Sequence, residues 1–174
     1  MKRILAFVTA AVLCCSLAAC GGEDSSAAYL GYTFEITVPE GFTKGEEIPE
    51  GIEQYWQAAD GSNITVVTME DDGSLASEIP GDQMQQVMEE SYVSQLGEDA
   101  KMSDFTFEHT EVDSCPAYRM SFVLTVSGVT IRQYSMGING DKAYTITCTD
   151  MTGGDWTEAF ETMLESGIKA VPVS

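Results

Sequence analysis

The chain has 174 residues, of which 28 are Asp or Glu and only 8 are Lys or Arg, so its formal net charge is −20 at pH 7. Phosphate backbones repel such a chain, which excludes nucleic-acid binding as its function. The same charge excludes attachment to an anionic membrane surface by electrostatic attraction alone. Cations and basic partners would instead be attracted.

The first twenty residues have the layout of a secretory signal that ends in a cysteine. The basic pair Lys2-Arg3 precedes an apolar run over 4–13, and the triplet over 17–19 reads Leu-Ala-Ala before Cys20. This resembles the bacterial lipobox, in which the cysteine receives diacylglycerol, becomes the new N-terminus and is often acylated, for example with palmitate. We therefore expect residues 1–19 to be a signal peptide and Cys20 to be lipidated. A plain secreted protein with an incidental cysteine is the alternative.

Cleavage before Cys20 would change both charge and location. It removes two basic residues and no acid, which leaves 6 Lys or Arg against 28 Asp or Glu, a formal charge of −22. Two or three acyl chains anchor a protein stably. Residues 20–28 are small and polar, so we expect the lipidated cysteine and a flexible tether there, followed by one globular domain over 29–174. The expected location is the extracytoplasmic face of a bacterial cell membrane.

The first half of the domain is predicted to hold three strands and a helix. Apolar residues alternate over 32–38, 53–58 and 63–69, which is typical of strands. Residues 82–96 change to helical spacing, with the apolar stripe expected to be buried, and Gly97 ends the helix.

The second half is predicted to hold four strands and a helix. The strands cover 105–112, 117–126, 129–138 and 143–149. Tight turns are expected at 127–128 and at 139–142. A final helix is expected to begin at Asp155, which forms a capping box with Glu158, and to end at Gly167.

These elements predict an α+β fold: a mainly antiparallel sheet of about seven strands with helices packed on it. The segments TFEITVPEGF, PAYRMSF, AYTITC and FETMLESGI, in that order, resemble the PsbP-like fold. This α/β/α sandwich is shared by PsbP of photosystem II, a Ran-binding nuclear transport factor and the DcrB-type bacterial lipoproteins. The resemblance covers about residues 30–170 and implies a fold and an envelope role at most. The family spans unrelated functions, so no catalytic residue carries over.

The sequence offers no recognisable catalytic or metal-binding constellation. It lacks G-x-S-x-G, and its single histidine, His109, continues the alternation of Phe105 and Phe107, so we expect it to close an apolar face. One histidine and two distant cysteines match no familiar zinc spacing. The acidic run over 70–73 lacks the spacing of an EF-hand loop and is interpreted as a solvated turn. We expect no enzyme activity, no cofactor and no metal site.

Cys115 and Cys148 remain once the signal and the lipidated cysteine are set aside. If strands 117–126, 129–138 and 143–149 pair in sequence, the two cysteines lie at opposite ends of the sheet, roughly 25–30 Å apart. A disulfide needs Cα atoms within about 7 Å. We therefore expect no disulfide, and a buried free thiol at Cys148.

One face of the predicted sheet gathers the only two arginines of the expected mature chain. Pairing around the two tight turns gives a candidate ligand face of Arg119, Ser121, Arg132, Tyr134, Thr145 and Thr147. The guanidinium fork suits carboxylate or phosphate, so a small-anion pocket is one interpretation. In the other, acids on a covering helix or a neighbouring strand pair with the arginines.

Together these observations predict a lipid-anchored envelope protein that acts as a non-enzymatic binding or interaction domain. Its contact with the membrane would run through the lipid on Cys20, and its partner would be an envelope protein or a small ligand. The alternative is a small-anion or small-molecule-binding lipoprotein that uses the Arg119/Arg132 face.

Overall fold

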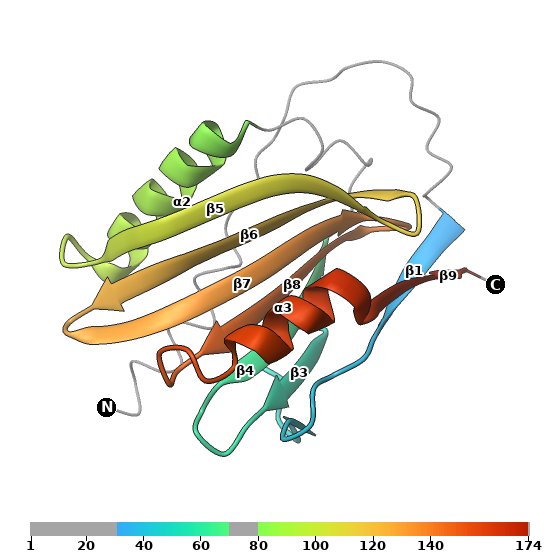
Figure 1. Cartoon of the computed structure of the whole chain (residues 1–174), viewed down its shortest axis with the longest axis horizontal. Helices are drawn as coiled ribbons and strands as arrows, with labels where there is room; N and C mark the ends of the chain where they lie inside the picture. The colour runs from blue at the N-terminus through green and yellow to red at the C-terminus, as the bar shows by residue number, and fades with distance from the viewer. Residues whose placement is uncertain (1–30, 70–79, 174) are drawn as a thin grey trace.

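The computed structural model describes residues 31–69 and 80–173. In chain order the elements are β1 (Tyr32–Ile36), β2 (Thr43–Lys44), β3 (Gln54–Gln57), β4 (Asn63–Met69), α2 (Gly81–Leu96), β5 (Lys101–Val112), β6 (Cys115–Val126), β7 (Val129–Asn139), β8 (Ala143–Asp150), α3 (Thr157–Ser166) and β9 (Ile168–Pro172) (Figure 1). Seven strands form one antiparallel sheet in the order β2-β3-β4-β8-β7-β6-β5. The predicted α+β fold is therefore confirmed. The predicted signal peptide, Cys20, the tether and the acidic run over 70–73 lie outside the described residues.

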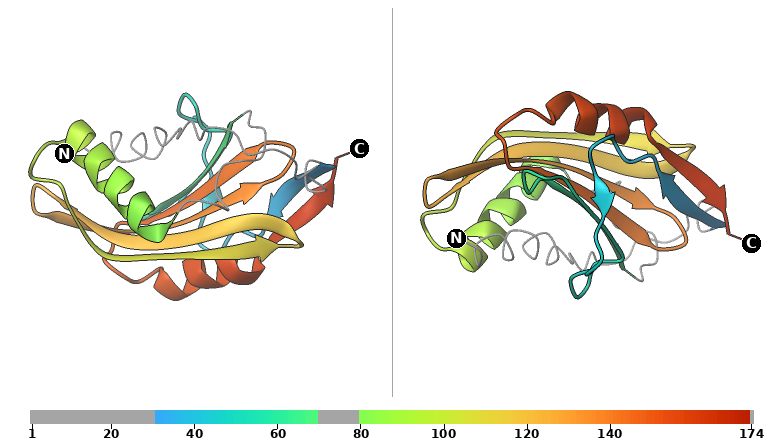
Figure 2. Two further views of the ribbon diagram at one scale, coloured as in Figure 1. Left: turned by 90° about the horizontal axis from the view of Figure 1, so that it is seen from above. Right: turned by 90° about the horizontal axis from the view of Figure 1, so that it is seen from below.

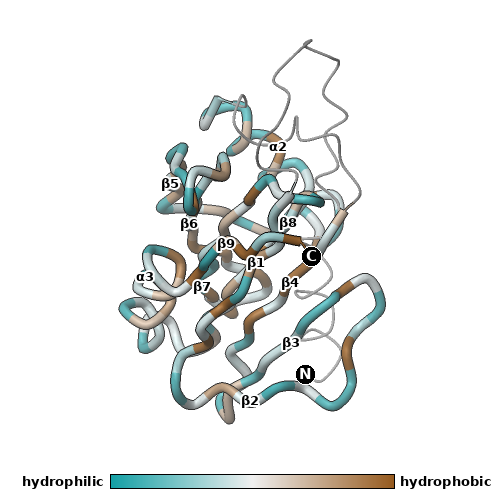
Figure 3. Tube along the Cα trace, turned by 90° about the vertical axis from the view of Figure 1, so that its right-hand side faces the viewer, coloured by the Kyte–Doolittle hydropathy of each residue, from teal (hydrophilic) through white to brown (hydrophobic). Residues whose placement is uncertain are grey.

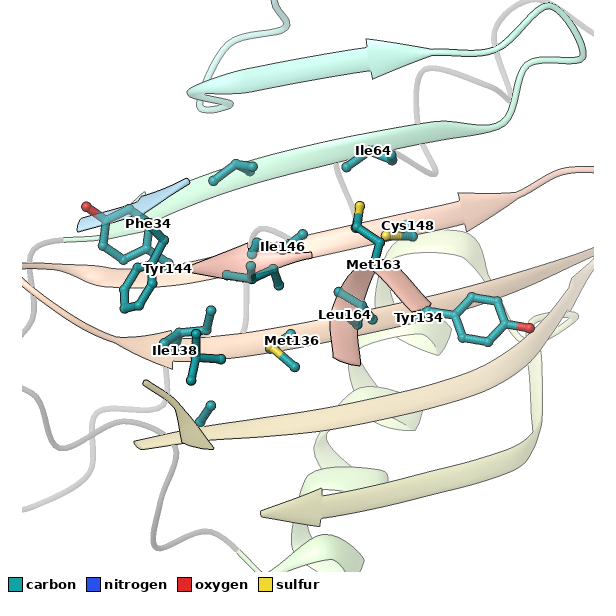
Figure 4. Packing of buried hydrophobic residues seen from close by; sticks show 14 of the residues in the cluster. Phe34, Ile64, Tyr134, Met136, Ile138, Tyr144, Ile146, Cys148, Met163 and Leu164 are labelled. Carbon is teal, nitrogen blue, oxygen red and sulfur yellow. The ribbon is translucent and has the colours of Figure 1, made fainter. Parts of the chain in front are cut away.

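The helices α2 and α3 cover opposite faces of this sheet (Figure 2). On one face, α2 buries the predicted stripe residues Met84, Met88 and Tyr92. They pack on apolar side chains from the middle of the sheet, namely Met120, Phe122, Leu124 and Ile131. On the other face, α3 buries Phe160, Met163 and Leu164 over Tyr134, Met136, Ile138, Tyr144, Ile146 and Cys148 (Figure 4). Each face thus has its own apolar cluster.

Two hairpins join β5, β6 and β7 through two-residue turns. Asp113 and Ser114 have φ of 48° and 72°, and Ser127 and Gly128 have φ of 51° and 80°. Positive φ at both turn residues is typical of the hairpin turns whose twist matches that of the strands they join. The turn predicted at 127–128 is confirmed.

The first strand lies outside the main sheet, contrary to prediction. It pairs antiparallel with β9, a short strand that the sequence analysis missed because it directly follows the last helix. The backbone N–H of Val173 also donates to the carbonyl oxygen of Gly31 at 2.8 Å. The start of β1 and the end of β9 therefore lie side by side (Figures 1 and 3). The seventh strand of the main sheet is β2, which was not predicted either.

The predicted register of the β7–β8 hairpin is wrong by one residue. Asn139, rather than Ile138, pairs with Ala143. The reason is a shorter loop over 140–142, in which the N–H of the first residue donates to the carbonyl of the third at 2.9 Å. Successive strand residues point to opposite faces, so a slip of one residue moves every β8 side chain to the other face.

The predicted capping box of α3 is also wrong. The helix begins at Thr157 with Trp156 in the N-cap position, and no side chain caps it there. Asp155 is exposed. The completely buried Asp150, at the end of β8, instead accepts hydrogen bonds from the loop that leads into α3. Its carboxylate accepts the N–H of Thr152 at 2.8 Å and the N–H of Trp156 at 3.1 Å.

Both cysteines in the described part of the chain are free, as predicted, and both are buried, whereas burial had been predicted for Cys148 alone. Burial raises the pKa of the Cys148 thiol far above its ordinary value. Burial, together with the nearby Asp113 carboxylate, also raises the pKa of Cys115. Neither sulfur is therefore a ready thiolate nucleophile.

The Tyr144 hydroxyl links β1 to the main sheet. It donates to Asp141 Oδ1 at 2.5 Å and forms a 3.0 Å hydrogen bond with Thr33 Oγ1 on β1. Burial, followed by the hydrogen bond to Asp141, raises the pKa of Tyr144 to about 12.

This raised pKa predicts alkaline destabilisation. The unfolded tyrosine loses its proton near pH 10, whereas folded Tyr144 keeps it to about pH 12, so the free energy of unfolding falls across that interval. The slope from this one group approaches about 1.4 kcal/mol per pH unit. Urea unfolding from pH 8 to 12 measures it against Tyr144→Phe, whose curve should be lower at pH 8 and should lack this component. Parallel curves for the two proteins would contradict the prediction.

Candidate functional site

The six residues of the predicted ligand face are divided between the two faces of the sheet. Arg119, Ser121, Arg132 and Tyr134 share the α3 face, whereas Thr145 and Thr147 lie on the α2 face. The first hairpin has the predicted register, with Ser121 opposite Tyr134. The slip in the second hairpin moves the two threonines away, so the structure does not bring the six residues together.

The two arginines do not share a pocket. Arg119 pairs with Met136, which lies four residues along β7 from Arg132, a separation of about 13 Å along the strand. Between them the buried Tyr134 ring packs against α3, and its hydroxyl lies 2.8 Å from Thr157 Oγ1. The Tyr134 side chain therefore lies between the two arginine positions.

Arg119 already has an acidic partner. Its Nε donates to Glu108 Oε1 at 2.7 Å, and Glu108 lies directly opposite it on β5. The same Glu108 carboxylate also forms an ion pair with Nη2 of the Arg119 guanidinium group. Glu161 and Glu165 of α3 line the same hollow. A bound anion would meet three carboxylates there, which disfavours the small-anion interpretation at this arginine.

Arg132 lies at the other end of α3. It pairs with the buried Asp150 across β7 and β8. Within residues 31–69 and 80–173 it forms no ion pair. The neighbouring Asp150 carboxylate would repel an anion at this position, which weakens the small-anion interpretation at Arg132 as well.

The α2 face carries a buried polar network that the sequence analysis missed. The Tyr92 hydroxyl donates to Gln133 Oε1 at 2.6 Å, and Gln133 Nε2 donates to Thr149 Oγ1 at 3.2 Å. The Ser135 hydroxyl donates to Thr147 Oγ1 at 3.3 Å. The available signal was the run of polar residues at alternate positions of β7 and β8. These groups satisfy one another, so Thr147 has a structural role in the folded domain.

On the α3 face of the sheet, a groove lies between α3 and the strands β5 and β6. One hollow of about 400 Å³ and a second of about 370 Å³ share Arg119, Leu164 and Glu165. They form one depression, here termed the β5–α3 groove, between Thr106–Asp113 on the strand side and Glu161–Lys169 on the helix side.

The described residues hold no arrangement that points to catalysis. His109 lies on the α2 face beside Phe107, with ring centroids 5.1 Å apart, but it is exposed rather than buried. In the part of the chain that the structure describes, no three His, Cys, Asp or Glu side chains converge to hold a metal ion. Over the same ranges, no helix has the length and apolarity required to cross a bilayer.

No protein-family model matches the chain, and no curated protein matches it either. Solved structures do resemble it. LpqN of Mycobacterium tuberculosis, described as involved in cell envelope biogenesis, aligns with a TM-score of 0.49 and 12% identity over 81% of this chain and 84% of LpqN. Cyanobacterial PsbP (CyanoP) from Synechocystis aligns with a TM-score of 0.61 and 13% identity over 89% of this chain and 99% of CyanoP. At such identities the likeness bears on architecture alone, and only the CyanoP alignment is close enough to do so. The chain has the PsbP-like fold.

Proposed function

We propose that this protein is a lipid-anchored, extracytoplasmic binding domain of a bacterial envelope, which acts by contacting a protein partner rather than by catalysis. The observation that carries the proposal is Leu-Ala-Ala-Cys20 after a basic start and a short apolar run. Two acyl chains or more would hold the chain stably at a membrane.

The arrangement of the ends supports this proposal. Gly31 begins the described domain, and its carbonyl accepts a hydrogen bond from Val173 at the far end of the chain. A tether over 20–28 would therefore enter the domain beside the β1–β9 ribbon. Among the described strands β5 pairs with β6 alone, so its outer edge has no strand partner there.

The alternative, a small-anion site on the two arginines, has weaker support. Arg119 is paired with Glu108, and Arg132 lies opposite Asp150. The acidic surface instead favours a basic partner, because the expected mature chain has 6 Lys or Arg and 28 Asp or Glu.

Replacing Cys20 with serine tests the anchor. We expect the unsubstituted chain, expressed in a bacterium fed radiolabelled palmitate, to carry label and to sediment with membranes. Cys20→Ser should lose the label completely, because serine lacks the thiol that receives diacylglycerol. Cys14→Ser and Cys15→Ser are matched controls within the predicted signal and should remain labelled. Label retained by Cys20→Ser, or absent from every variant, would refute the anchor.

A further inference from the structure

The strand β5 forms a long edge of the main sheet. It pairs only with β6, and none of its backbone groups bonds to another described segment on its outer side. After an irregularity between Ser103 and Thr106, the pairing is regular from Thr106 to Val112. In an antiparallel strand, every second residue directs its N–H and C=O away from the neighbouring strand. This stretch therefore presents a ready template for another strand.

The edge is bordered by acidic side chains on the α3 face. Glu108 projects there from β5, and Glu161 and Glu165 of α3 form the far wall of the β5–α3 groove. All three glutamates are exposed. Glu108 is neutralised by Arg119, whereas the two helix glutamates form no ion pair with any described residue. The hollow lined by Glu161 and Glu165 therefore has two carboxylates available to a basic ligand, whereas Lys169 lines the other end of the groove.

The shape and chemistry of this surface favour one kind of occupant. The backbone edge favours an extended segment, and the carboxylates beside it favour lysine or arginine at positions facing α3. A second copy of the chain fits less well, because it would bring its own acidic edge against this one. A small metal ion fits less well, since no cluster of three possible ligands is present in the described residues.

We propose that the edge of β5 from Thr106 to Val112 binds an extended, basic segment of a protein partner as an eighth strand, with its cationic side chains directed toward Glu161 and Glu165. This inference rests on the proposed role as a binding domain and names the surface and the chemistry of its partner. The main-chain hydrogen bonds provide affinity, and the two carboxylates provide selection for basic side chains.

The test uses the protein expressed from all 174 residues and purified in a nonionic detergent, with a short blocked peptide alternating threonine and lysine as the probe. We expect saturable binding and slower amide hydrogen exchange at 106–112. A peptide with glutamate in place of lysine should not bind. A peptide N-methylated at every residue, which keeps the charges but removes the strand hydrogen bonds in either register, should bind at least about tenfold more weakly.

A matched pair of charge reversals tests the location. Glu161→Lys with Glu165→Lys should weaken the lysine peptide at least about tenfold. Glu89→Lys with Glu90→Lys makes the same change in net charge at exposed positions of α2, on the opposite face, and should have a much smaller effect. Equal weakening by both pairs would overturn the proposal, because it would indicate attraction to the overall charge. Equal binding of the N-methylated peptide, binding without protection of β5, or no binding would overturn it as well.

Failure of this inference and failure of the proposed anchor are distinguishable. Palmitate labelling of Cys20 does not involve β5, and peptide binding does not require the lipid. Labelled protein that ignores the peptide would remove only the β5 site, whereas unlabelled protein that binds it would remove only the anchor.

Discussion

Asp150→Ala is expected to lower the free energy of unfolding by about 3 kcal/mol. The side chain is completely buried, and both of its oxygens are used. Oδ1 accepts the backbone N–H and the hydroxyl of Thr152 at 2.8 and 2.6 Å, and Oδ2 accepts the N–H of Trp156 at 3.1 Å. Alanine removes three hydrogen bonds to a carboxylate and leaves their donors without a partner where β8 leads into α3. Urea unfolding followed by circular dichroism measures the loss.

Asp155→Ala is the matched control for this prediction. Asp155 is exposed, and no side chain caps α3 at its N-cap position. We expect a change below about 0.5 kcal/mol, as for most exposed positions. If the control cost as much as Asp150→Ala, the capping box inferred from the sequence would be right after all. Asp150→Asn should lie between the two, because its amide retains one acceptor oxygen.

Gly137→Ala is expected to destabilise the protein by about 2 kcal/mol. Gly137 lies directly opposite Tyr118 across β6 and β7, and a Cβ atom there would overlap the tyrosine ring. The ring cannot move freely, because it stacks on Phe107 with centroids 5.4 Å apart and an interplanar angle of 23°. Thermal and urea unfolding would both report the loss.

Gly31→Ala controls for the general effect of replacing glycine. Apart from its chain neighbours, no atom of the described residues lies within 4 Å of the position of its Cβ, so we expect little change. The specific cause is tested by combining Gly137→Ala with Tyr118→Ala. If overlap with the ring is the cause, the glycine substitution should cost much less once the ring is gone. An unchanged cost in the double variant would show that the backbone, and not the ring, requires glycine.

Local patterns predicted most of the elements well. The strand over 63–69 has the predicted limits, and the predicted helix over 82–96 differs by one residue at its start. The turn at 127–128 set the β6–β7 register correctly, because two residues with positive φ permit only a tight hairpin there. Errors arose where a short segment depends on a distant partner. β9 became a strand by pairing with β1, and its five residues carry no decisive pattern of their own.

The candidate ligand face shows how a small local error changes a site. A loop of three residues instead of four moved Thr145 and Thr147 to the α2 face, where Thr147 is buried and hydrogen-bonded. The acidic partner of Arg119 was among the alternatives that the sequence left open. Which of 28 acids would supply it depended on the pairing of β5 with β6, and the structure identifies Glu108.

The sequence by itself determined the fold class, the hairpin at 127–128, the buried stripes of both described helices and the expectation of free cysteines. These depend on periodicity, turn chemistry and strand length, which act over a few residues. It also carries the whole basis for expecting a lipid at Cys20. Only the tertiary structure decided that β1 leaves the main sheet, that Asp150 holds the start of α3, and that β5, near Glu161 and Glu165, pairs with β6 alone among the described strands. Each of these depends on which distant segments meet, and that is settled by the packing of two helices on opposite faces of one sheet.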